Sequence, residues 1–158
     1  MSSGIVFMLA LGIGIVAGLR YLTAPAVVAW AAHLVWINVH GGPLAFMSSM
    51  WAVGIFTLLA VGEFIGDQLP STPPRTSAVG LSARIVTGAL CGACLAVAGG
   101  ASMVVGGLVG ATGGVAGAFG GYYARTGLVR RLRVPDFAIA IPEDLVAVGL
   151  GLILVSRL

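Results

Sequence analysis

The scarcity of charge is the feature that most limits what this chain can fold into. Of its 158 residues, 59% are hydrophobic and only 8% are charged, and the mean hydropathy is +1.09. The run from Pro43 to Val61 contains no charged residue. A soluble domain covers its surface with roughly 25–35% charged residues. The composition therefore predicts an integral membrane protein, with the lipid bilayer as its surroundings.

The expected fold is an all-α transmembrane bundle of about five spans, because each span uses roughly 20 apolar residues. Residues 1–158 are expected to form one membrane domain. The apolar segments, turns and prolines predict helices at about 4–20, 24–38, 49–68, 81–98, 102–124 and 136–156.

The first apolar segment, Ile5 to Val39, is too long for a single straight span. It would measure about 50 Å at 1.5 Å per residue, against a hydrocarbon core of about 30 Å. Thr23 can cap a new helix, and Pro25 suits a first helical turn. We therefore expect a break that carries Arg20. The helix after it could be a short span, a re-entrant half-helix or an interfacial segment.

Two carboxylates, Glu63 and Asp67, end the third predicted helix. They are four residues apart and so share one helix face. A second pair, Glu143 and Asp144, follows Pro142. Carboxylates in hydrocarbon are costly unless they face the bundle interior, water, a cation or an arginine. These four residues are predicted to bind a cation or a proton, and Glu63 with Asp67 would hold a metal if there is one.

Arg20 is the basic residue expected near this site. It would tune the pKa of the carboxylates or contact the substrate. Two alternatives stay open: a structural ion pair with an acidic residue, and an anion pocket formed with the helix N-terminus at Thr23. For the first carboxylate pair the alternative is also structural, with Asp67 at the lipid headgroups and Glu63 tied to an arginine.

Arginine-rich loops stay on the cytoplasmic side of a membrane. Loops 69–80 and 125–134 are therefore expected to be cytoplasmic, in a bacterial inner membrane. The N-terminus is inside if residues 4–38 cross once, and outside if they cross twice.

Small residues dominate the predicted helix 102–124. Overlapping glycine ridges, which allow close helix packing in lipid, place it at the centre of the bundle or of a homo-oligomer; they comprise Gly106, Gly110 and Gly114, and Gly113, Gly117 and Gly121. The strings 14–18 and 113–117 are nearly the same, which is consistent either with an inverted repeat or with chance in a glycine-rich chain.

No enzyme activity is expected, because no nucleophile–base pair stands out. Cys91 and Cys94 have redox spacing, but they lie in a small-residue stretch that indicates packing. No cofactor is expected. Nucleic acid is also excluded as a partner, because no stretch is densely basic and aromatic.

Four segments carry a family resemblance: 18–25, 63–70, 72–76, and 135–144 with its Glu143-Asp144 end. Together they resemble a bacterial family of small membrane proteins of unknown function, of the DUF4126 type. The resemblance covers nearly the whole chain and implies no activity. The chain is also similar, more distantly, to cation/proton exchangers of the lysine-exporter superfamily with Glu-x-Gly-Asp motifs. Here Glu63 and Asp67 stand one residue further apart than in that motif.

Two functions follow from the sequence. The first is a small transporter or channel-like protein that moves a cation or a proton-coupled small solute. The second is a non-transporting membrane scaffold or assembly protein, with internal salt bridges and glycine-mediated oligomers.

Overall fold

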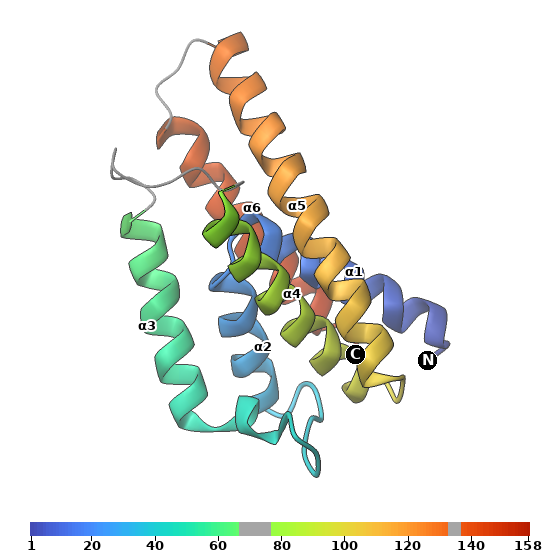
Figure 1. Cartoon of the computed structure of the whole chain (residues 1–158). Coiled ribbons are helices and arrows are strands. Elements are labelled where there is room, and N and C mark those ends of the chain that lie inside the picture. Colours follow the sequence, from blue (N-terminus) through green and yellow to red (C-terminus); the bar gives the residue numbers. More distant parts are fainter. Residues whose placement is uncertain (67–76, 133–136) are drawn as a thin grey trace.

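Helices make up all of the regular structure in the part of the chain that the computed structural model describes, residues 1–66, 77–132 and 137–158. The all-α class predicted from the sequence is therefore confirmed (Figure 1). In chain order the elements are α1 (Ser3–Leu19), α2 (Thr23–His33), a short 3-10 helix η1 (Ala45–Ser48), α3 (Met50–Gly66), α4 (Ala78–Ala98), α5 (Met103–Leu132) and α6 (Phe137–Val155).

Two of the described helices, α4 and α5, are long and apolar enough to cross a membrane. Helices α1 and α3 are apolar but shorter, at 17 residues each. Large apolar side chains also point outward, among them Met8, Trp51 and Val79, which are 73%, 82% and 81% exposed. The chain thus has the membrane-helix character that its composition predicts.

The break expected near Arg20 is present. Helix α1 ends at Leu19 and α2 begins at Thr23. Helix α2 then ends at His33, five residues before the predicted end, and Val35 has a positive φ of 60° that no α-helix can continue through. Helix α2 is buried against protein along almost its whole length. At 11 residues it is about 17 Å long, shorter than a bilayer core.

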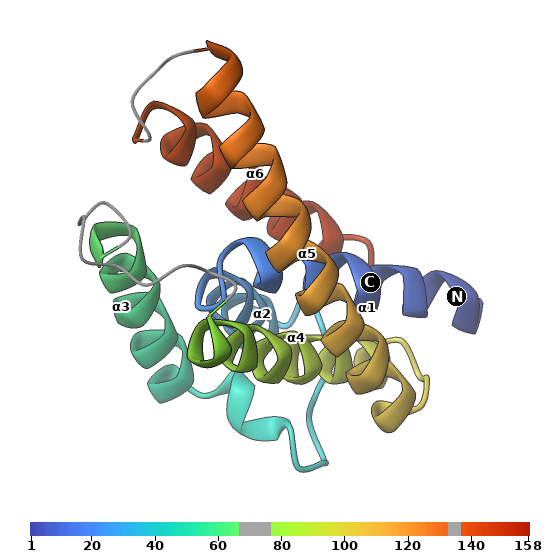
Figure 2. The ribbon, with the colours of Figure 1, turned by 45° about the horizontal axis from the view of Figure 1, so that its top comes forward.

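Segment 4–38 leaves one end of the bundle and returns to it. Near its start, Val6 packs against Gly99 in the α4–α5 turn, and Leu158 lies against the same glycine. The chain that follows α2 lies at this same end of the bundle (Figure 1). The chain termini and the turns therefore gather at one end, and the break reaches toward the other (Figures 1 and 2).

Helices α1, α4 and α5 form a tightly packed core. They touch one another more extensively than any other helices do. Gly110 of α5 lies between Gly14 of α1 and Gly88 and Gly92 of α4, so that backbone meets backbone. A side chain at any of these positions would overlap the neighbouring helix. The central position predicted for the glycine-rich helix is confirmed.

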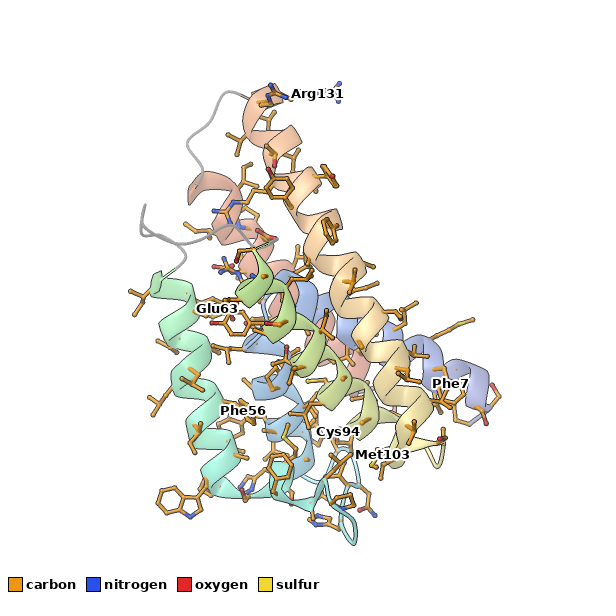
Figure 3. The ribbon with its side chains drawn as sticks, in the orientation of Figure 1. Phe7, Phe56, Glu63, Cys94, Met103 and Arg131 are labelled. Atoms are coloured by element: carbon orange, nitrogen blue, oxygen red, sulfur yellow. The ribbon has the colours of Figure 1, made fainter. Side chains whose placement is uncertain are left out.

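Helix α5 is longer than predicted, because it continues to Leu132 instead of ending at residue 124. Arg125, Arg130 and Arg131 are therefore helical, and the prediction of a loop over 125–134 is wrong for its described part. Arginine is a strong helix former, so the basic cluster extends the helix. Arg131 lies at the tip of α5, away from the other helices (Figure 3).

The two similar strings pack against each other, but they do not form an inverted pair. Gly14 lies against Gly113, and further along Gly18 lies against Gly117. Because the residue numbers rise together, α1 and α5 run in the same direction where they touch (Figure 1). An inverted repeat requires opposite directions. For these strings the inverted-repeat interpretation is wrong.

The glycine core predicts a large loss of stability for Gly88→Ala. The new Cβ would lie 2.6 Å from the carbonyl oxygen of Gly110, a backbone atom that cannot rotate away. We expect a loss of about 3 kcal/mol, at the upper end for overpacking, measured by thermal unfolding in detergent. The matched control is Gly149→Ala inside α6, where the Cβ meets open space. It should be neutral or stabilising by about 0.5–1 kcal/mol. Equal effects of the two changes would contradict the close packing.

Candidate functional site

The break between α1 and α2 is capped by a carboxylate from another helix. Glu63, one turn before the end of α3, accepts the backbone N–H of Tyr21 through Oε1 and that of Leu22 through Oε2, each at 3.0 Å. The first N–H groups of a helix have no partner within the helix, and their dipole favours negative charge. Glu63 is 6% exposed. Its carboxylate therefore accepts the hydrogen bonds that water would accept if this helix start were at the surface. It lies on the side of α3 that faces α2 (Figure 3).

The capping role predicted for Thr23 is wrong. Leu22 occupies the cap position, and Thr23 is the first helical residue. The Thr23 hydroxyl is buried and has no hydrogen-bond partner among the residues that the structure describes. The sequence contained the residue types for a local cap, but the cap comes from a residue 41 positions away.

Arg84 holds the other side of the break. Two turns into α4, it is 3% exposed, and its Nε donates to the carbonyl oxygen of Gly18 at 3.0 Å. Its Nη1 donates to the carbonyl oxygen of Gly80 at 2.8 Å, and its guanidinium lies 5.3 Å from the centre of the Tyr21 ring. Gly18 is close to the end of α1, where the helix dipole favours a cation. Arg84 is not among the predicted site residues, although an arginine inside an apolar helix is a usable signal of such a role.

Arg20 forms an ion pair with Asp144 of α6. Its side chain is 1% exposed, against 18% for Asp144. The guanidinium also lies 5.6 Å from the centre of the Phe64 ring on α3. Arg20 thereby connects the break to both α3 and α6, as the alternative of a structural ion pair anticipated.

A second ion pair lies beside the first. Glu143 of α6 is 3.6 Å from Nη1 of Arg125 on α5, and both side chains are largely buried. Neighbouring residues on a helix point about 100° apart. Glu143 and Asp144 consequently serve different partners, one on α5 and the other at the break.

Three predicted site residues, Arg20, Glu63 and Asp144, thus meet at residues 20–22. Glu143 is adjacent to this group because it precedes Asp144 in the chain. Asp67 falls outside the described residues. The set formed by these four described residues with Arg84 and Arg125 is called the charge cluster below. It holds three arginines and three carboxylates, so its formal charges balance. Such balance lets charges persist in an apolar bundle.

In the described part of the chain, no group of three or more His, Cys, Asp or Glu side chains could hold a metal ion. Cys91 and Cys94 are buried free thiols inside the apolar core (Figure 3), as expected for packing residues. The metal site suggested for Glu63 and Asp67 involves an undescribed residue.

Fold and site together define a class: an all-helical protein with candidate membrane-crossing helices and a buried, balanced charge cluster at a helix break. Residues 7–156 match the family model of DUF4126, a domain of unknown function, and the chain belongs to this family. The family resemblance seen in the sequence is confirmed. No curated protein and no solved structure matches the chain. Any activity must therefore be argued from the site itself.

The ion pair predicts a strong effect of Asp144→Asn on stability. The change takes the Asp144 charge away from the buried Arg20 guanidinium, and breaking comparable buried pairs costs about 3–5 kcal/mol. The double variant Arg20→Met/Asp144→Leu removes both charges and should regain most of the loss. Thermal unfolding in detergent measures both. Arg131→Gln, at an exposed residue of α5, is the control and should change stability by less than about 0.5 kcal/mol. A mild effect of Asp144→Asn would show that the pair is not needed for folding.

Proposed function

We propose that this protein is a small membrane transporter or channel-like protein. It moves a cation or a proton-coupled small solute through the charge cluster. The observation that carries the proposal is the position of the cluster at a helix break inside the bundle. Transporter sites typically use discontinuous helices, whose free ends contact ions and charged substrates. Ionisable residues are costly within membrane helices, so those that are present are candidates for a function.

The chemistry of the cluster supports the proposal. Asp144 and Glu63 each neutralise a positive group, Arg20 in one case and the N-terminus of α2 in the other. A proton or a cation that binds either carboxylate competes with that group and releases it. Binding at the cluster would therefore change which helices hold together.

The packing supplies a fixed part and a part that can move. The glycine contacts pack α1, α4 and α5 tightly together. Helix α6 makes few contacts with α5 and packs mainly against α1 and α2. Loss of the Arg20–Asp144 pair would loosen α6 and α2 from this core. In the proposed mechanism, that movement opens the cluster to one side of the membrane.

The proposal places the protein in the bacterial inner membrane. The helix ends near Gly66 and Arg131 would face the cytoplasm, because basic residues gather there. The chain termini, at the other end of the bundle, would then lie outside.

A scaffold or assembly protein is the second candidate. One observation favours it: every carboxylate and arginine of the charge cluster has a partner within the chain. Gly54 and Gly62 of α3 also face open space, where a second copy could approach closely. On this view the cluster only holds the helices together.

Proton flux into proteoliposomes distinguishes the two functions. Under a potassium-clamped membrane potential, with a pH dye inside the vesicles, we expect flux through the wild type. Glu63→Gln should reduce it by more than about tenfold, the effect of a general acid–base group being about 10²–10⁴-fold. Arg131→Gln is the control and should transport normally. No flux above empty liposomes, or equal flux through wild type and Glu63→Gln, would favour the scaffold.

A further inference from the structure

The start of α2 already binds a carboxylate, namely that of Glu63. Each carboxylate oxygen accepts one backbone N–H, from Tyr21 and Leu22. Neither N–H contacts the methylene groups that link this carboxylate to α3. The contacts therefore suit any carboxylate of similar size, whether it belongs to the chain or to a solute.

A second observation points to a ligand with one more polar group than Glu63 has. Thr23 is 2% exposed, and within the described part of the chain its hydroxyl has no hydrogen-bond partner. It belongs to the same turn as the two N–H groups. A buried hydroxyl without a partner is unfavourable, and the carboxylate of Glu63 does not relieve it. A solute with a hydroxyl next to its carboxylate would bring such a partner.

We propose that the N-terminus of α2 binds a small 2-hydroxycarboxylate, and that Glu63 occupies this site in its absence. This inference rests on the proposed transport function and specifies its substrate class. When the solute binds, Glu63 leaves the amides as the neutral acid, with a proton taken up from the aqueous phase. The exchange keeps the charge cluster balanced, because one carboxylate replaces another. Uptake of the proton avoids moving a bare charge through the apolar bundle, which would be costly.

One proton is thus taken up for each solute bound. By linkage, the dissociation constant of the wild type falls about tenfold for each unit decrease in pH while Glu63 is ionised in the empty site. Lactate is the probe. Lactamide is its neutral counterpart, and propionate lacks the hydroxyl.

The test is binding to the purified protein in detergent, by calorimetry and thermal unfolding at pH 5.5 and 7.5. Lactate should bind the wild type and lactamide should not, with the pH dependence given above. In Glu63→Ala the competing carboxylate is gone, so lactate should bind at least about tenfold more tightly at pH 7.5, without that pH dependence. If this variant does not fold, Glu63→Gln serves, since it keeps the shape and removes the charge.

Thr23→Val tests the second contact. Lactate should bind this variant about tenfold more weakly, whereas propionate should bind as it does to the wild type. Thr112→Val is the control, because its hydroxyl donates to Val109 on an exposed face of α5; it should change neither affinity.

Three results would overturn the inference: no lactate binding to any form, binding only when Glu63 is removed, or equal binding of lactate and lactamide. These results are separable from failure of the transport function. Proton flux without lactate binding would refute the 2-hydroxycarboxylate site and support the transport function. Lactate binding without proton flux would refute the transport function and support the binding site.

Discussion

The contact between the Glu63 carboxylate and the backbone amides of Tyr21 and Leu22, just before α2, is the interaction on which the first half of the chain depends. Helix α2 starts inside the protein, where water cannot satisfy its N–H groups. Non-helical backbone at membrane depth is tolerated only where the protein satisfies it. Glu63 does so for α2, and Arg84 does so for α1 through the carbonyl oxygen of Gly18. At the break, the negative Glu63 therefore lies at the start of α2 and the positive Arg84 lies at the end of α1, as the two helix dipoles favour.

The glycine-packed helices give these charges fixed positions. Arg84 is on α4, and its backbone carbonyl lies against Gly114 of α5. A side chain at position 114 would therefore displace Arg84. Asp144 comes from α6, which rests on α1 and α2. The charge cluster therefore joins a rigid three-helix core to the less tightly held helices. A change in the charge of one member alters how these two parts are held together, whichever of the proposed functions is correct.

Several features were predictable because they depend on local chemistry. Pro25 and the excessive length of the first apolar segment located the break, and the glycine ridges located the central helix. Other predictions failed because they needed long-range information. Thr23 is a good capping residue, but the cap came from Glu63 on α3. The similar glycine strings carried no sign of direction, and they pack side by side in the same direction.

By itself, the sequence determined the helical class, the family, the break and the residues worth suspecting, because apolar composition, proline and isolated charges act over a few residues. Only the tertiary structure decided how those charges pair. Arg20 could have met any of the carboxylates, and it met Asp144 because α6 packs across the break. Arg84 became part of the cluster because α4 and α1 both lie against the glycines of α5. Pairing between distant helices follows from how closely their backbones can approach, and that is a property of the assembled bundle.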